Sequence, residues 1–347
     1  MLALQAVTPG QLAAAIPEVS LAEARKLVAQ IHRGEQVSAS SSVRRTAADA
    51  VRAAGSVPTL TVVAESASEV DPFVKYALDS GGARFEAVRI PLEHPGRFTV
   101  CVSSQVGCAL ACAFCATGRL GLVRNLAAWE IVEQVRIVRA RLPRGRVHGV
   151  VFQGMGEPLA NLDAVLDAIA VLTEPCAQGI DARAITVCTA GLPSGIRRLA
   201  QEAPNVRLGL SISSAIAAHR KRVMPIADRH DLDDVIDASV EHAQRTGHSP
   251  MWAVTLLDGV NDTDDDASAL AQRVLAFAER TGRRPRLSLL DYNAIGEAAN
   301  GAADPFRRSP RMAAFRAVLS AAGLASHRRY SGGSDVAAAC GQLANAV

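Results

Sequence analysis

The sequence predicts an α/β fold with a parallel sheet in its larger, C-terminal part. Six apolar segments, each followed by a helical pattern, recur after about residue 96. Strands that alternate with helices in this way form parallel sheets with right-handed crossovers. Six such units make either an open doubly wound sheet or a partial barrel, and in both the chemistry gathers at the carboxyl ends of the strands.

The first part of the chain, residues 1–95, predicts a small α+β accessory domain, with 96–347 as the core domain. Residues 1 to about 55 have helical patterns, in which Ser20 and Glu23 have the spacing of a capping box. Three short strands are then expected, with "DSGG" as the hairpin turn between the last two. These strands are 59–66, 73–79 and 84–90.

The core strands are expected as short, mostly apolar runs that alternate with helical stretches. They are 98–104, 147–154, 184–190, 206–212, 251–257 and 286–292. Long amphipathic patterns over 127–142 and 161–172 predict two of the helices that connect them.

The composition is that of a globular protein with reduced thiols. Hydrophobic residues make up 49% of the 347, which is enough for a large core. The N-terminus lacks the basic region of a signal peptide, and no run of about 18 apolar residues predicts a membrane span. Seven cysteines, an odd number, favour metal or catalytic thiols over a disulfide framework. We therefore expect a cytoplasmic protein.

The net charge of +3 does not decide the kind of partner. Only three of the 37 basic residues are lysines, and arginine suits bidentate contact with phosphate. A GC-rich genome would give the same arginine excess, so the composition is compatible with RNA binding without requiring it.

Four cysteines stand within "CVSSQVGCALACAFCATG", residues 101–118. Cys108, Cys112 and Cys115 follow the first core strand, where this fold places its active site. Three thiolates at short spacing can hold three corners of an iron–sulfur cube and leave one iron open for a substrate. The alternatives are a zinc site, which would need a fourth ligand, or unreactive buried thiols.

The motif C-x3-C-x2-C resembles that of the radical S-adenosylmethionine (radical SAM) enzymes. Together with "GMGEPL" (154–159) and "DVAAACGQL" (335–343), it makes the chain similar to the RlmN/Cfr family of RNA adenine methyltransferases from about residue 59 onward. The resemblance implies a partial (β/α)6 radical SAM barrel and S-adenosyl-L-methionine as cofactor. It also implies a 4Fe-4S cluster on Cys108, Cys112 and Cys115, with Phe114 shielding it.

The resemblance also implies the cofactor contacts. Gly156 and Glu157 would bind S-adenosylmethionine, the carboxylate by pairing with the methionyl ammonium group. Two positions depart from the family, which usually has serine at Cys188 and histidine at Ser213, and they leave room for a different substrate. The further contacts implied are Cys188, Ser211, Ser213 and Asn293.

Cys340 matches the family cysteine that is methylated by a first cofactor molecule. In that family, the 5′-deoxyadenosyl radical from a second molecule abstracts hydrogen from the S-methyl group, and the carbon radical adds to carbon 2 or 8 of adenine. These ring carbons are not nucleophiles, so covalent radical catalysis divides a difficult step. By resemblance, Cys101 resolves the crosslink by forming a disulfide with Cys340, and Glu86 accepts a proton. Taken alone, Cys101 would be a buried strand thiol and Glu86 an exposed strand residue.

The implied partner is RNA: 23S rRNA, with transfer RNA as a second candidate. Basic runs are expected beside the active-site end, and Tyr292 or Tyr330 as stacking partners for an extruded adenine. The runs are 219–222, 283–286, 307–311 and 327–330. Two alternatives remain: the same radical chemistry on a small molecule or peptide, and a non-enzymatic metal- or RNA-binding module. We also expect a monomer with no membrane contact. Its electron donor would be a protein such as flavodoxin or ferredoxin. Cys176 matches no motif and is expected to be structural.

Overall fold

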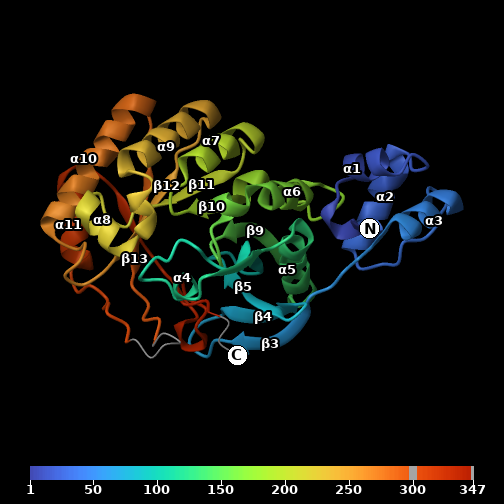
Figure 1. Ribbon diagram of the computed structural model, residues 1–347, viewed down its shortest axis with the longest axis horizontal. Helices are drawn as coiled ribbons and strands as arrows, with labels where there is room; N and C mark the ends of the chain where they lie inside the picture. Colours follow the sequence, from blue (N-terminus) through green and yellow to red (C-terminus); the bar gives the residue numbers. More distant parts are fainter. Residues whose placement is uncertain (297–302, 345–347) are drawn as a thin grey trace.

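The protein is organised around one ten-stranded sheet, as the computed structural model shows in Figure 1. The structure describes residues 1–296 and 303–344. The strand order is β14-β13-β12-β11-β10-β9-β6-β5-β4-β3. In chain order these strands are β3 Thr61–Ala67, β4 Val74–Ser80, β5 Ala83–Pro91, β6 Arg97–Val102, β9 Arg146–Phe152, β10 Ile185–Thr189, β11 Arg207–Ser211, β12 Met251–Leu256, β13 Arg286–Asp291 and β14 Ser326–Arg329.

Six β/α units form the parallel part of this sheet, from β6 to β14. Figure 1 shows the helices along the outside of the strands, as right-handed crossovers require. The helices that complete the units are α5 Ala128–Ala140, α6 Leu162–Thr173, α7 Pro193–Glu202, α9 Leu232–Thr246, α10 Asp264–Thr281 and α11 Met312–Ala321. The predicted α/β fold, a partial (β/α)6 barrel, is confirmed, and β14 adds one strand that the sequence did not predict.

Three antiparallel strands extend the sheet on the other side. β3, β4 and β5 pair in succession, and β5 pairs with β6, so that Val88 lies opposite Cys101. The sheet therefore continues across the division predicted near residue 95, and that division stays a prediction. The predicted turn is present: Gly82 N donates to Asp79 Oδ1 over 3.0 Å.

Three N-terminal helices pack around a small core of their own, which includes Leu12, Leu27 and Val51. They are α1 Pro9–Ala15, α2 Leu21–His32 and α3 Arg45–Ala54. The predicted capping box begins α2, because Glu23 N donates to Ser20 Oγ (3.3 Å) and Ser20 N donates to Glu23 Oε2 (3.1 Å).

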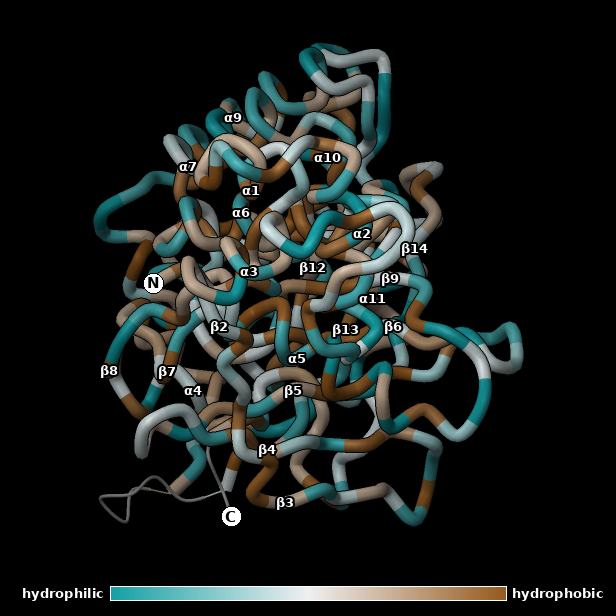
Figure 2. The backbone as a smooth tube through the Cα atoms, turned by 90° about the vertical axis from the view of Figure 1, so that its right-hand side faces the viewer, coloured by the Kyte–Doolittle hydropathy of each residue, from teal (hydrophilic) through white to brown (hydrophobic). Residues whose placement is uncertain are grey.

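The main core lies between the sheet and its helices. Val100, Val150 and Val187 come from neighbouring strands and are fully buried. Trp252 of β12 meets Phe277 of α10 edge to face, with ring centroids 5.2 Å apart. Figure 2 shows apolar segments in the interior around β12 and β13 and hydrophilic segments on the outer coils. In the described part of the chain, no helix is both long and apolar enough to cross a bilayer.

Several short elements of two to seven residues were not predicted, because such short runs carry little periodicity. The ribbon β7 Gln105–Gly107 and β8 Leu122–Asn125 frames the three-cysteine loop and matters most for the site. The others are β1 Leu2–Ala3, β2 Gly55–Ser56, α4 Ala116–Arg119 and α8 Ala217–Val223, with single 3-10 turns at Leu4–Ala6, Pro158–Asn161, Ala182–Ala184, Pro225–Asp228 and Ser334–Val336.

Candidate active site

A cavity of about 210 Å³ opens at the carboxyl ends of the parallel strands. This is the end at which β/α folds place their chemistry. Six of the seven cysteines line it: Cys101, Cys108, Cys112, Cys115, Cys188 and Cys340. The predicted ligands, the predicted methyl carrier and the predicted resolving thiol therefore share one cavity.

Backbone contacts fix the shape of the three-cysteine loop. Cys108 N donates to the carbonyl of Gly121 over 2.8 Å, and Cys115 N donates to that of Cys112 over 3.1 Å. Gly118 must lack a side chain, because a Cβ there would lie 2.8 Å from the carbonyl oxygen of Cys112. The backbone of the loop is thus held by hydrogen bonds, and Phe114 also lines the cavity.

The donor set of this loop suits an iron–sulfur cube better than a single ion. Burial raises the pKa of the Cys108 thiol to about 11 and also raises those of Cys112 and Cys115, so the site favours thiolates only when cationic iron is bound. Among the described residues, no three His, Cys, Asp or Glu side chains stand close enough to share one metal ion. A structural zinc ion takes four protein ligands, whereas this loop offers three thiols, so the donor set fits a cluster with three protein ligands.

The turn after β9 brings Glu157 to the cavity wall. Gly156 has φ +97°, and a Cβ there would lie 2.5 Å from the Cβ of Gln105, so only glycine fits. The Glu157 carboxylate accepts hydrogen bonds from Leu159 N (3.0 Å) and Ala190 N (2.9 Å). Burial nevertheless raises the pKa of Glu157 to about 6. A ligand ammonium group placed here would stabilise the ionised carboxylate.

The structure separates the other four predicted cofactor contacts into two pairs. Cys188 and Ser211 line the cavity, at the ends of β10 and β11. Ser213 and Asn293 are not among its lining residues. Ser213 is 2% exposed with φ +57°, and Asn293 donates to the carbonyl oxygen of Cys340 over 3.1 Å. The cofactor roles of all four stay predictions.

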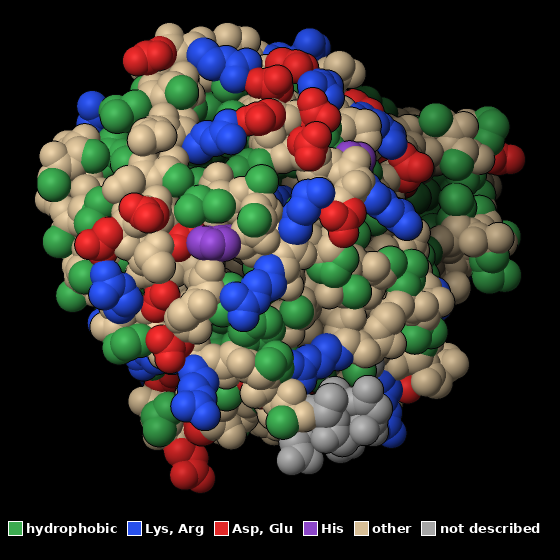
Figure 3. Space-filling model, turned by 60° about the vertical axis from the view of Figure 1, so that its left-hand side comes forward, with side chains coloured by type: hydrophobic (Ala, Val, Ile, Leu, Met, Phe, Trp, Pro, Cys, Tyr) green, Lys and Arg blue, Asp and Glu red, His purple; other side chains and the backbone are tan. Residues whose placement is uncertain are grey.

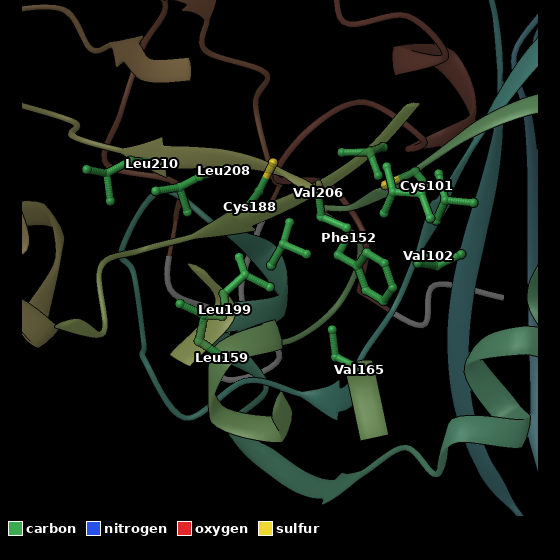
Figure 4. Close-up of a cluster of buried hydrophobic side chains, with 14 of the residues drawn as sticks. Cys101, Val102, Phe152, Leu159, Val165, Cys188, Leu199, Val206, Leu208 and Leu210 are labelled. Atoms are coloured by element: carbon green, nitrogen blue, oxygen red, sulfur yellow. The ribbon is translucent and has the colours of Figure 1, made fainter. Parts of the chain in front are cut away.

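Cys340 enters the cavity from the C-terminal segment. Its backbone N–H donates to Ser331 Oγ over 2.8 Å, and its sulfur accepts a hydrogen bond from Gln153 Nε2 over 3.4 Å. Burial raises the pKa of Cys101 to about 12, and the neighbouring Cys340 raises it further. Figure 4 shows the sulfurs of Cys101 and Cys188 on the side of the strands away from Leu159 and Leu199.

The predicted disulfide between Cys101 and Cys340 is absent from the structure. All seven cysteines are free. The Cys340 sulfur is held by the Gln153 amide instead, and the Ser331 contact fixes its backbone. The sequence resemblance therefore identified two thiols of one cavity but not a bond between them in this state.

Glu86 is fully buried, and the expectation of an exposed strand residue is wrong. Its carboxylate lies 3.1 Å from Lys75 Nζ, and Lys75 is itself only 5% exposed. Glu86 Oε2 also accepts a hydrogen bond from Ala344 N over 2.9 Å. Taking both charges out of water is costly, and their mutual attraction offsets part of this cost.

Gln153, Arg329 and Ser331 line the same cavity and were not predicted as site residues. Burial raises the pKa of Cys188 to about 12 and raises that of Cys340, while the Arg329 guanidinium opposes both shifts. The sequence signals were position and charge: Gln153 directly precedes "GMGEPL", Ser331 directly precedes "GGSD", and Arg329 belongs to the basic run 327–330.

The structure corrects part of the expected RNA-binding surface. Arg220, in the run 219–222, is 1% exposed and donates to the carbonyls of Ser211 (2.8 Å) and Ala190 (2.6 Å). The run 283–286 ends in the first residue of β13 and so lies at the amino end of this strand, opposite the cavity. In the view of Figure 3 the basic side chains alternate with acidic ones and form no continuous patch.

The two predicted stacking residues differ in accessibility. Tyr292 is 5% exposed, and its hydroxyl donates to Asp304 Oδ2 over 2.7 Å, so it cannot stack on an RNA base. Tyr330 is 69% exposed and lines the mouth of the cavity. Of the two, Tyr330 alone stays a candidate.

Comparisons with known proteins agree with this geometry. Residues 102–274 match the model of the Radical SAM superfamily. The chain is 58% identical to a "Probable RNA methyltransferase" of Sorangium cellulosum, over 97% of this chain and 90% of that protein. It is 40% identical to a "Probable dual-specificity RNA methyltransferase RlmN" of Picosynechococcus sp., over 78% of this chain and 74% of that protein.

A solved structure is similar over nearly the whole chain. It is a radical SAM methyltransferase from Sphaerobacter thermophilus, with 34% sequence identity and a TM-score of 0.85. The match covers 99% of this chain and 100% of the other. With the cysteine cavity described above, these similarities show that the protein is a radical SAM methyltransferase and belongs to the RlmN/Cfr family of RNA methyltransferases.

Proposed function

We propose that the enzyme methylates carbon 2 or carbon 8 of an adenine in RNA, with Cys340 as the carrier of the methyl group. The observation that carries this proposal is the shared cavity: Cys340 lies with the loop of Cys108, Cys112 and Cys115 on one side and Cys101 on the wall. A cysteine in this place can accept a group from a cofactor bound at the loop. Curated relatives named dual-specificity RNA methyltransferases support RNA as the substrate. Within RNA, we propose 23S rRNA as the first candidate and transfer RNA as the second.

The residues suit the two cofactors of this family. Cys108, Cys112 and Cys115 would hold a 4Fe-4S cluster, and the turn with Gly156 and Glu157 would hold the methionyl end of S-adenosylmethionine. When bound, these groups would supply the methyl group and the radical that starts the reaction. The contribution of the chain is to place the acceptor sulfur beside them and to exclude water.

Three further residues receive roles in this proposal. Cys101, which lines the cavity together with Cys340, resolves the link between protein and RNA, as the family resemblance implies. Glu86 accepts the proton that is released during methylation. The hydrogen bond that it accepts from Ala344 N places it beside the end of the segment that carries Cys340. Arg329 lines the cavity with both thiols and stabilises their ionised forms.

The proposal is tested by the RNA of a strain that lacks the gene. We expect one methyladenosine to disappear from 23S rRNA or transfer RNA, because these ring carbons are not nucleophiles and polar methyl transfer cannot replace the lost enzyme. Complementation with the wild-type gene should restore it, and the Cys340→Ala gene should not. Mass spectrometry of nucleosides makes the measurement. An unchanged profile would refute the RNA role and favour a small-molecule or peptide substrate.

A flavodoxin or ferredoxin as electron donor, a monomeric state and a cytoplasmic location stay predictions.

Substitution of Gln153 tests the positioning of the acceptor sulfur. In Gln153→Leu the sulfur of Cys340 loses its amide hydrogen bond, so we expect methylated Cys340 to form about 3- to 10-fold more slowly. The measurement is mass spectrometry of the Cys340 peptide during a single turnover. Gln178→Leu is the matched control, because Gln178 bonds His32 over 2.9 Å and does not line this cavity. Equal rates in both variants would show that the hydrogen bond has no function.

A further inference from the structure

The turn between β3 and β4 is bonded to the C-terminal segment, more than 250 residues away in the sequence. Asp71 of this turn accepts two hydrogen bonds at Oδ2, from Tyr330 OH (2.7 Å) and from Gly333 N (2.8 Å). Its other oxygen accepts from Phe73 N (3.1 Å), which fixes the carboxylate within its own turn. The Asp71 carboxylate, held in place by its own turn, therefore binds the segment just before Cys340.

A second carboxylate makes the reciprocal contact. Asp335, in the C-terminal segment, accepts hydrogen bonds from Ser68 Oγ (2.7 Å) and from Glu69 N (2.9 Å) of the β3–β4 turn. The β3–β4 turn and the C-terminal segment thus each contribute one carboxylate, which accepts hydrogen bonds from the other segment. We call the contact of 68–73 with 330–335 the tail latch.

Close packing surrounds the tail latch. Tyr330 meets Phe73 edge to face, with ring centroids 6.1 Å apart. A Cβ on Gly332 would lie 2.5 Å from the ring of Phe73. Gly333 has φ +74°, and a Cβ there would lie 2.7 Å from the Cβ of Ala338. Only a segment without side chains at these two positions can approach the turn so closely.

The tail latch is connected directly to Cys340. Ser331, between the two latch donors, accepts the backbone N–H of Cys340 over 2.8 Å. Asn293 donates to both Ser331 Oγ (3.3 Å) and the Cys340 carbonyl (3.1 Å). Ala338 N donates to the Gly333 carbonyl over 2.8 Å, which closes the intervening turn. The position of the Cys340 backbone is therefore set by residues that the tail latch holds.

The chain after Cys340 is tied to the three-cysteine loop and to Glu86. Ala116 N donates to the Gly341 carbonyl over 2.7 Å, and Thr117 Oγ1 donates to the Leu343 carbonyl over 2.5 Å. Cys340 thus lies between two anchors, the tail latch before it and the cluster loop after it. The latch side is exposed at Tyr330 and Asp335, so it is the anchor that can open locally.

We propose that Asp71 and Asp335 are positioning residues, which hold Cys340 in the cavity by closing the tail latch. This inference rests on the proposed function, in which the Cys340 sulfur must meet a methyl donor. Transfer to a sulfur requires the reacting atoms to be placed within fractions of an ångström, and a segment near the chain end does not keep such a place without anchors. Opening of the latch releases Cys340 from the cavity, and closure returns it.

The test measures the accessibility of Cys340 in the anaerobically purified holoenzyme. Asp71→Asn with Asp335→Asn keeps the shape of both side chains and removes their charges; a double alanine variant removes the acceptors. We expect iodoacetamide to alkylate Cys340 about tenfold faster in these variants, with faster hydrogen exchange over 330–344. Asp79→Asn is the matched control, because Asp79 caps the β4–β5 turn and does not touch the tail.

The outcomes distinguish a tail latch from general stabilisation of the fold. Alkylation of Cys340 at the wild-type rate in the double alanine variant would overturn the tail latch. A fall in melting temperature with faster exchange throughout the sheet would also overturn it, because the carboxylates would then be general stabilisers. With RNA we expect kcat to fall about 3- to 10-fold at constant KM. Alkylation needs no RNA, so the two proposals can fail separately. If the wild-type enzyme methylates no RNA, but Cys340 is still alkylated faster in the variants, the proposed function is refuted and the tail latch is not.

Discussion

Cys340→Ala is expected to lose RNA methylation by about 10³-fold or more, because the variant lacks the sulfur that carries the methyl group. Cleavage of S-adenosylmethionine should continue, since the three-cysteine loop is intact. The volume change is small, so the melting temperature should stay within a few degrees of the wild type.

The measurement pairs a nucleoside assay for methyladenosine with an assay for 5′-deoxyadenosine, on the same samples. Cys176→Ala is the matched control, because this thiol packs beside the N-terminal helices and does not line the cavity. A Cys340→Ala enzyme that still methylated RNA at a comparable rate would show that the methyl group travels by another route.

Cys112→Ala should abolish both reactions. Without one of the three thiolates the cube loses a protein corner, so we expect iron content to fall to about a tenth or less and the brown colour to be lost. The chain should stay folded, because the loop is fixed by backbone hydrogen bonds to neighbouring segments.

Iron analysis, the visible absorption spectrum and 5′-deoxyadenosine production together check this result. Cys188→Ser serves as the control within the same cavity, since it replaces one thiol that is not proposed as a ligand and restores the residue that the family usually has. Full iron content in Cys112→Ala, or its loss in Cys188→Ser, would assign the ligands differently.

Most of the fold could be predicted because its signals are local. The apolar run that forms β12 and the Ser20–Glu23 capping box act over a few residues and are recovered at the predicted places. The cysteine loop was equally accessible, because three closely spaced thiols after a strand indicate a metal-binding loop. The short ribbon of β7 and β8 was missed, since three or four residues do not establish a period.

The parts that could not be predicted depend on contacts between distant segments. Arg220 belongs to a basic run, but three backbone carbonyls that surround it in the fold make it a buried brace. Its burial lowers its pKa to about 10. Tyr292 is buried by a partner that comes later in the chain. Asp71 and Asp335 look like ordinary surface acids until the fold places their segments together.

Labelled methyl transfer tests the central claim most directly. The anaerobic enzyme is incubated with S-adenosylmethionine that carries a trideuterated methyl group, without RNA, and its cysteine peptides are then analysed by mass spectrometry. We predict one labelled methyl group on Cys340 and none on Cys101 or Cys188, although all three thiols line the cavity. Label on another cysteine, or no protein label while RNA added later is still methylated, would contradict the account.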